Sequence, residues 1–178
     1  MRYVHVYRYK GNGENSTMKK MMTLILAALM LVGTLSACGG SKEAPAANVD
    51  LTTFYADIEE DNDWGGGYMA DIEGEMLESY YPGLAAIETE QFIAKMPLMS
   101  AVVNEVVFLQ CKNEEDAAAA AAILQERVTM QAEGGAWYPE SMEAWGKAVV
   151  IQNGTYVAMI ASAEYQDDIV EEFNELFA

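Results

Sequence analysis

The feature that most limits what this chain can fold into is a leader-like segment near its start. Two lysines, Lys19 and Lys20, precede an uncharged, apolar stretch over residues 21–37 that ends in Leu-Ser-Ala-Cys. A positive end, a short apolar run and small residues before a cleavage point are typical of a secretory signal peptide, whereas a membrane-spanning helix needs about 20 apolar residues. The sequence therefore predicts a lipobox, removal of residues 1–37 and attachment of lipid to Cys38.

This cleavage would divide the chain into three parts. Residues 1–37 combine an upstream extension, ahead of Met18, with the signal peptide. Residues 38–48 start at the lipidated cysteine and are rich in Gly, Ala, Ser and Pro, which is typical of a flexible tether. Residues 49–178 are left for a single domain. Because two acyl chains hold a protein at a membrane surface, we expect a lipid-anchored protein at the extracytoplasmic face of the cell membrane.

Charge is distributed very unevenly along the chain. From Cys38 onward, five basic residues stand against 27 acidic residues, which gives a net charge of about −22. An electrostatic field of this sign repels nucleic acid and bare anionic lipid, and it favours cations or basic partners. The composition therefore excludes nucleic-acid binding.

Local patterns predict helices and strands in alternation over residues 49–178. Three helices are expected to begin after the N-cap residues Asp50, Asn113 and Ser162. Residues 101–111 are dense in β-branched side chains, which predicts a buried strand. Asn153-Gly154 is a preferred two-residue turn and predicts a β-hairpin around it.

The segment between the first helix and the buried strand has weaker patterns. We expect short helical turns over residues 75–80 and 88–94, on either side of the Tyr81-Pro82-Gly83 break. Together these elements predict an α+β domain with a small, mainly antiparallel sheet of about three strands and helices packed on one face.

The only histidine, His5, lies in the segment expected to be removed. The remaining domain therefore has no Ser-His-Asp set, no Cys-His set and no histidine metal ligand. Cys111 has no second cysteine to pair with once Cys38 carries lipid, so we interpret it as a small buried apolar residue. The sequence predicts a non-catalytic domain without a cofactor; the alternative is an envelope enzyme that uses paired carboxylates.

Two segments have ligand types that metals prefer. Residues 57–65 concentrate carboxylates, but their spacing departs from the EF-hand template, so we interpret them as a solvated helix end, with weak Ca²⁺ binding as the alternative. Met96 and Met99 could supply thioethers to Cu(I), yet methionines without a nearby histidine or second cysteine are usually core residues. We therefore expect no metal site.

Aromatic residues beside Pro and Gly are the candidate ligand-binding residues, because loops often carry binding function. They are Trp64, Tyr81, Trp137 and Tyr138, and the same group of possible groove aromatics includes Tyr80 and Trp145. The alternative is that they cover a small core. Glu105 is a lone acid within the apolar strand; alternation predicts that it faces solvent, and a buried, partnered carboxylate is the other interpretation.

Several short motifs follow one another in an order that resembles a known family, the bacterial lipoproteins grouped as domain of unknown function 4358. The motifs are Val49-Asp50-Leu51, Tyr80-Tyr81-Pro82-Gly83-Leu84, Lys95-Met96-Pro97-Leu98-Met99, Glu105-Val106-Val107, Gln125-Glu126-Arg127, Trp137-Tyr138-Pro139-Glu140 and Gly154-Thr155-Tyr156-Val157. The resemblance implies a Gram-positive, membrane-anchored extracytoplasmic domain and supplies no catalytic residues. With it, the sequence predicts a domain that binds a small ligand or another protein at the cell envelope.

Overall fold

The computed structural model describes residues 5–8, 48–62, 69–99 and 101–178. The core of the molecule is one antiparallel sheet with the strand order β1-β5-β6-β4-β3-β2. Its strands are β1 (His5–Arg8), β2 (Met69–Asp71), β3 (Thr89–Pro97), β4 (Asn104–Cys111), β5 (Val149–Asn153) and β6 (Tyr156–Ser162). Five of the six lie in the part of the chain expected to form the domain, so the expectation of about three strands was wrong. The α+β class and the antiparallel pairing are confirmed.

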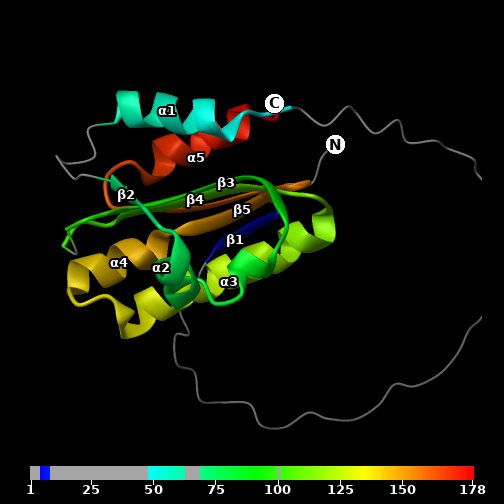
Figure 1. Ribbon diagram of the computed structural model, residues 1–178. Coiled ribbons are helices and arrows are strands. Elements are labelled where there is room, and N and C mark those ends of the chain that lie inside the picture. Colours follow the sequence, from blue (N-terminus) through cyan, green and yellow to red (C-terminus); the bar gives the residue numbers. More distant parts are fainter. Residues whose placement is uncertain (1–4, 9–47, 63–68, 100) are drawn as a thin grey trace, which may run out of the picture. The chain divides into compact units, whose positions relative to one another are not determined.

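Five α-helices accompany the sheet, and Figure 1 shows them on both of its sides. They are α1 (Leu51–Asp61), α2 (Gly74–Tyr80), α3 (Glu114–Met130), α4 (Pro139–Lys147) and α5 (Gln166–Glu175). Short turns of 3₁₀-helix and π-helix occur at Leu84–Ala86 and Gln131–Gly135. Within the described residues, no helix combines the length and the apolar character needed to cross a bilayer.

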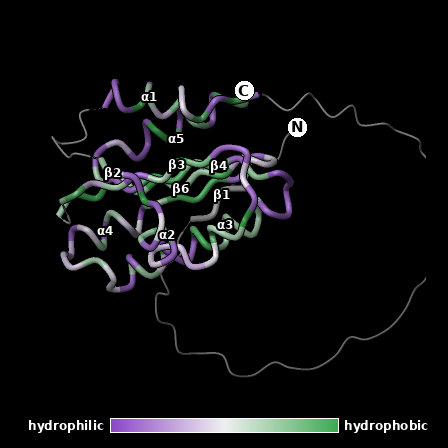
Figure 2. The backbone as a smooth tube through the Cα atoms, in the orientation of Figure 1, coloured by the Kyte–Doolittle hydropathy of each residue, from purple (hydrophilic) through white to green (hydrophobic). Residues whose placement is uncertain are grey.

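The prediction that helices cover one face of the sheet was wrong, because alternate residues of β4 enter two separate cores. Val106 and Phe108 pack with α1 and α5, whereas Val107 and Leu109 pack with α3. A strand buried on both faces reads as a continuous apolar run rather than as an alternating one. In Figure 2 the central strands are accordingly mainly hydrophobic, while α1 alternates between hydrophobic and hydrophilic residues.

The helix starts at Asp50 and Asn113 are confirmed. The Asp50 carboxylate accepts hydrogen bonds from the backbone N–H groups of Thr52 and Thr53, and the Asn113 side chain accepts one from Asp116 N–H. Such bonds satisfy N–H groups that have no partner inside the helix. The hairpin is confirmed as well, with Gly154 at φ +60° in its turn.

Two local predictions failed. Residues 88–94 were expected to be helical but form most of β3, because their backbone groups pair with β4 and this pairing overrides the helix preference of Glu, Gln and Ala. Ser162 was expected to cap the last helix directly. It lies at the end of β6 instead; its hydroxyl accepts a hydrogen bond from the N–H of Tyr165, the residue just before α5.

Hydrogen bonds connect the start of the domain, at Val49 and Leu51, to one end of the sheet. The backbone N–H of Leu51 donates to the Gln91 side chain, whose amide group donates to the carbonyl of Val49. Val49 N–H donates to the hydroxyl of Tyr156. These bonds fix the start of α1 beside the first residues of β3 and β6, which is the end of the sheet where β4 finishes.

Candidate functional site

The most unusual polar group of the core is a buried ion pair between β4 and α3. Arg127 donates from Nε and Nη2 to the two carboxylate oxygens of Glu105, at 3.0 and 2.9 Å. The hydroxyl of Tyr81 donates to the same carboxylate. Both charged side chains are less than a tenth exposed. Forked guanidinium–carboxylate pairs of this kind are the strongest hydrogen-bonded ion pairs in proteins.

The folding of two neighbouring elements explains how these charges meet. Glu105 shares the face of β4 used by Val107 and Leu109, and this face lies under α3. Arg127 falls on the buried stripe of α3, three residues after Leu124 and about two helical turns after Ala120. The outward-facing interpretation of Glu105 was therefore wrong: helices cover both faces of β4, so the acid is buried and paired.

Aromatic rings surround the guanidinium of Arg127. Its Cζ atom lies 4.4 Å from the ring centre of Tyr80, 5.4 Å from that of Trp145 and 5.9 Å from that of Tyr81. Burial opposes the charge of Arg127, but the hydrogen bonds and charge of Glu105 outweigh this effect and raise the Arg127 pKa. Burial, followed by the Glu105 charge, raises the pKa of Tyr81 well above its ordinary value. Tyr81 therefore stays a neutral donor.

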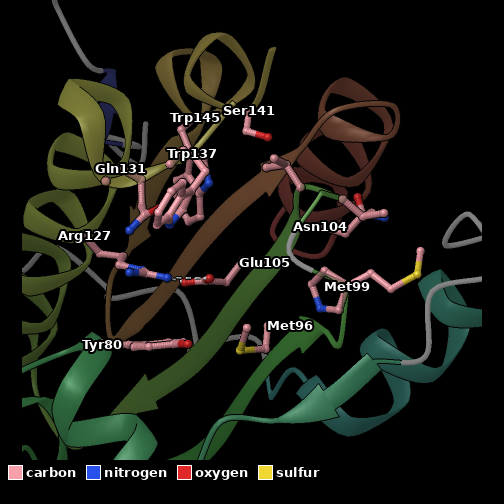
Figure 3. Close-up of a pocket in the computed structure, with 15 residues that line it drawn as sticks. Tyr80, Met96, Met99, Asn104, Glu105, Arg127, Gln131, Trp137, Ser141 and Trp145 are labelled. Atoms are coloured by element: carbon pink, nitrogen blue, oxygen red, sulfur yellow. Dashed lines mark hydrogen bonds and ion pairs between the residues drawn. The ribbon is translucent and has the colours of Figure 1, made fainter. Parts of the chain in front are cut away.

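A pocket of about 250 Å³ opens beside this network (Figure 3). One wall comes from the end of β3, which includes Met96, and from the turn that follows it, which includes Met99. The other wall comes from Trp137, just before α4, and from Trp145 in α4. Arg127 and Glu105 lie between these walls with their ion pair intact. The pocket thus joins apolar and aromatic walls to a charge pair that is already neutralised.

A second pocket, of about 280 Å³, adjoins the first. Four residues line both: Val102, Val103, Asn104 and Ser141. The second pocket differs in charge, because Glu140 and Glu164 lie in its wall and no basic residue does. Together the pockets have an aromatic part and an acidic part that meet at Asn104 and Ser141.

The candidate residues from the sequence divide into three groups. Trp137 lines the first pocket and is 91% exposed at its rim, whereas Tyr138 is half exposed but lies outside the pocket wall. Tyr81 is completely buried and contacts Glu105 rather than the pocket. Trp64 and Cys38 lie outside the described residues.

One residue of the site, Arg127, escaped the sequence reasoning, whereas Tyr80 and Trp145 were already among the candidate groove aromatics. Arg127 carried a usable signal, because it is a charged residue on the buried stripe of an otherwise alanine-rich helix, and a buried Arg requires a buried acid. The nearest candidate for that acid, Glu105, was already conspicuous in its strand. Tyr80 and Trp145 were expected in a groove, but only the tertiary fold shows that both rings lie next to Arg127.

The other sequence candidates belong to the core or surface. Cys111 is buried and unpaired with another cysteine, and burial, followed by the charge of Asp116, raises its pKa to about 11. Among the described residues, no group of three or more His, Cys, Asp or Glu side chains is arranged to hold a metal ion. Met96 and Met99 line the pocket together with carbon-rich neighbours.

These observations define a small α+β domain in which one antiparallel sheet, covered by helices on both faces, has a paired pocket at one end. The profile of the family described as "Domain of unknown function (DUF4358)" matches residues 62–162. The match includes the ion pair and most of the pocket wall, and the chain belongs to this family. Comparisons with curated proteins and with solved structures found no match.

Proposed function

We propose that this protein is a lipid-anchored extracytoplasmic lipoprotein of a Gram-positive cell envelope, and that its domain binds a ligand without catalysis in the pocket beside Arg127. The observation that carries the proposal is the composition of the pocket wall. Exposed Trp137 and Met99 lie at an opening whose floor is a rigid ion pair. Ligand pockets typically combine apolar and aromatic walls with a few fixed polar groups.

The position of the pocket supports binding away from a membrane surface. Chain entry at Val49 is held near Tyr156, which pairs with Gln110 at one end of β4, whereas the pocket lies at the other end, around Asn104. Six residues of strand separate these ends by about 20 Å at the usual rise per residue. An anchor attached through residues 38–48 would therefore be joined to the domain on the side opposite the pocket.

The alternative, an enzyme that uses paired carboxylates, has less support from the geometry. Glu105 is the one carboxylate in the wall of the first pocket, and Arg127 and Tyr81 occupy its oxygens. An acid–base mechanism needs a carboxylate that exchanges a proton with the substrate and a second one at about 5–10 Å. Glu105 is buried with both of its oxygens in hydrogen bonds to Arg127, so it serves the fold.

The anchor is tested by feeding intact cells an alkyne-tagged fatty acid. We expect the tag on the wild-type protein and no tag on the Cys38→Ser variant, with mass spectrometry locating the modification on residue 38 of a chain that starts there. A protein that keeps its leader and a bare thiol would contradict this part of the proposal.

Binding is tested independently by placing a photoreactive amino acid at Met99, on the pocket rim, and at Glu115, an exposed position on α3 at the far end of the sheet. Irradiation of intact cells should produce a discrete adduct from position 99 only, and the additional substitution Trp137→Ala should reduce its yield about tenfold, the effect of losing a large aromatic contact. Equal adducts from both positions would contradict a pocket-specific ligand.

A further inference from the structure

We propose that the two adjoining pockets form one groove for an extended peptide segment, with a large apolar side chain in the aromatic pocket and a neighbouring basic side chain in the acidic pocket. The inference rests on the proposed binding function and adds the chemical class of the ligand. It follows from three features of the groove: its junction, its charge and the pairing of every basic side chain near it.

The junction has hydrogen-bonding groups that the domain itself leaves unused. Ser141 is 6% exposed and lines both pockets, yet its hydroxyl makes no hydrogen bond to any described residue. Asn104 is 4% exposed; its side-chain oxygen accepts from the Ser162 hydroxyl at 2.6 Å, and its NH₂ group has no partner among the described residues. Neither atom is fully enclosed by the domain, so both are available to a ligand with amide donors and acceptors.

The charge of the groove determines which charge a ligand side chain should have. The aromatic pocket contains one ion pair and is neutral overall, whereas the acidic pocket has Glu140 and Glu164, both exposed. Two carboxylates in one wall without a basic neighbour favour a cation through ionic contacts. A basic side chain fits this arrangement and an acidic one does not.

The basic residues of the domain are already paired with acids, which disfavours an anionic ligand in the groove. Each basic side chain of the described residues from 48 onward is within 4 Å of a carboxylate: Lys95 with Asp71, Lys112 with Glu88, Arg127 with Glu105, and Lys147 with Glu143. In the groove itself, Glu105 occupies the fork of Arg127 that a phosphate or carboxylate ligand would need. An anion would have to displace a buried, hydrogen-bonded acid.

An extended peptide accounts for all three features at once. Its backbone amides can pair with Asn104 and Ser141, and successive side chains can enter the two pockets on either side of that junction. A neutral oligosaccharide would also stack on Trp137, but it leaves the acidic pocket without a counter-charge. The sugar is therefore the competing outcome of the test.

The test uses the full chain, purified in detergent, and capped tetrapeptides measured by calorimetry. The probes contain Phe next to Lys, in both orders, within Gly flanks; matched controls replace Lys with Glu, or Phe with Ala. We expect one Phe–Lys order to bind and each control to bind at least about tenfold more weakly, because each loses one of the two subsites.

Variants locate the binding on the protein. Glu140→Gln with Glu164→Gln should remove the preference for Lys over Glu while retaining the preference for Phe over Ala. Ser141→Ala should weaken all peptides by a common factor of about three to ten, the effect of one lost hydrogen bond. The matched control Glu115→Gln, on the exposed surface of α3, should leave both preferences unchanged. Circular dichroism of each variant confirms that it is folded.

Three outcomes would overturn the peptide inference: equal affinity for Lys and Glu peptides, insensitivity to Ser141→Ala, or no peptide binding while a neutral N-acetylglucosamine tetramer binds in a Trp137-dependent way. The last outcome would leave the proposed binding function standing, because the pocket would be occupied by another class of ligand. If the photoreactive group at position 99 also yields no specific adduct, the proposed function fails together with the inference.

Discussion

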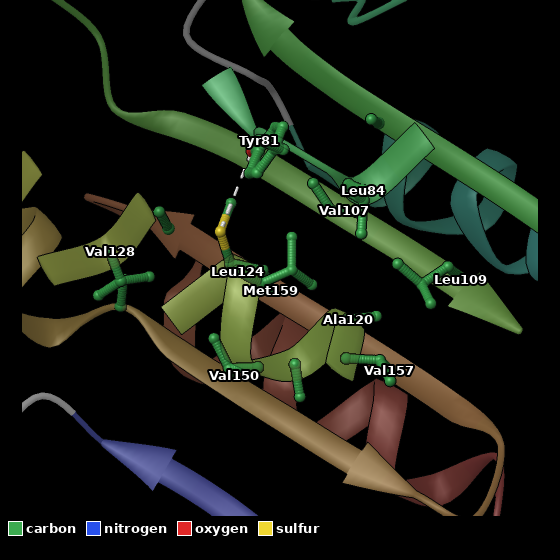
Figure 4. Close-up of a cluster of buried hydrophobic side chains, with 14 of the residues drawn as sticks. Tyr81, Leu84, Val107, Leu109, Ala120, Leu124, Val128, Val150, Val157 and Met159 are labelled. Carbon is green, nitrogen blue, oxygen red and sulfur yellow. Dashed lines mark hydrogen bonds between the residues drawn. The ribbon is translucent and has the colours of Figure 1, made fainter. Parts of the chain in front are cut away.

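The two faces of the sheet are built from different side chains and have different roles. On the face covered by α1 and α5, the aromatic rings of Phe54, Phe108 and Phe173 pack with centre-to-centre distances of 5.1 to 5.9 Å. On the opposite face, alanines of α3 share a core with Val107 and Met159, and Figure 4 shows Ala120 in this cluster. A buried charged pair also lies between α3 and this side of β4. The centre of the aromatic face is built from apolar side chains, and the alanine face holds the only buried ion pair found among the described residues.

The difference shows how one strand can serve stability and binding together. Even-numbered residues of β4 such as Phe108 point into the aromatic face, while odd-numbered residues such as Glu105 point into the alanine face. Aromatic side chains bury large areas, and each such burial contributes several kcal/mol. This contribution allows the other face to contain a charge pair, which stabilises less than apolar packing of the same volume.

The largest expected effect is on the aromatic face. Phe173→Ala should lower the free energy of unfolding by about 4 kcal/mol, because it leaves a cavity among three rings. Denaturant unfolding measures the loss. The adduct formed at position 99 should persist at temperatures where the variant is folded; a selective loss of the adduct would show that the two faces are coupled more tightly than their separate cores indicate.

Breaking the ion pair is the corresponding test of the alanine face. Arg127→Met should cost about 3 kcal/mol, since it leaves Glu105 buried without a partner. The double variant Glu105→Leu/Arg127→Met should be close to wild type in stability. If the single variant is as stable as wild type at neutral pH, the pair does not have the structural role assigned to it.

Titration of the buried thiol provides a smaller effect on the same face. Burial raises the Cys111 pKa from 9.0 to about 11, so the folded state holds a proton that the unfolded state releases first. Stability should therefore be complete below pH 9 and should fall by about 2 kcal/mol between pH 9 and pH 11. Cys111→Ala should flatten this part of the curve, measured as urea midpoints. An unchanged slope would assign the alkaline decline to other groups.

The smallest change removes a single hydroxyl. Tyr81→Phe should reduce stability by about 1–2 kcal/mol, because one hydrogen bond to a buried charge is lost. Arg127 still holds both oxygens of Glu105, so the shape of the pocket should be retained. Thermal unfolding and the peptide titration measure the two quantities separately. A loss of binding larger than the loss of stability would give Tyr81 a role in positioning the pocket floor.

Local signals in the sequence were enough to locate the elements that have their own start and stop residues. The caps at Asp50 and Asn113 and the Asn153-Gly154 turn depend on neighbouring residues only, and all three are confirmed. β3 was missed because its residues have helical preference and become a strand only through pairing with β4. The apolar run of residues 106–109 already indicated that helices cover both faces, since a strand with one solvated face alternates.

The site, too, was predictable only where a local sequence pattern marks a residue. Glu105 and the exposed Trp137 were identified from the sequence, because one is an acid in an apolar strand and the other lies beside a proline. Their partners come from elements far apart in the chain: α2 contributes Tyr80, and α4 contributes Trp145. No local sequence pattern predicts that these side chains come together, because their contact depends on how the helices cross the sheet.

The alanine face of α3 also sets how far that helix lies from the strands. Ala117, Ala120 and Ala121 are at most 1% exposed, and each presents only a methyl group to the sheet. Such short side chains bring the helix axis close to the strands, and this spacing lets the fork of Arg127 reach Glu105 along a direct line. Adding volume at Ala120 would lift the helix and lengthen that contact two turns away. The distance between helix and sheet thus links the packing of the core to the geometry of the ion pair.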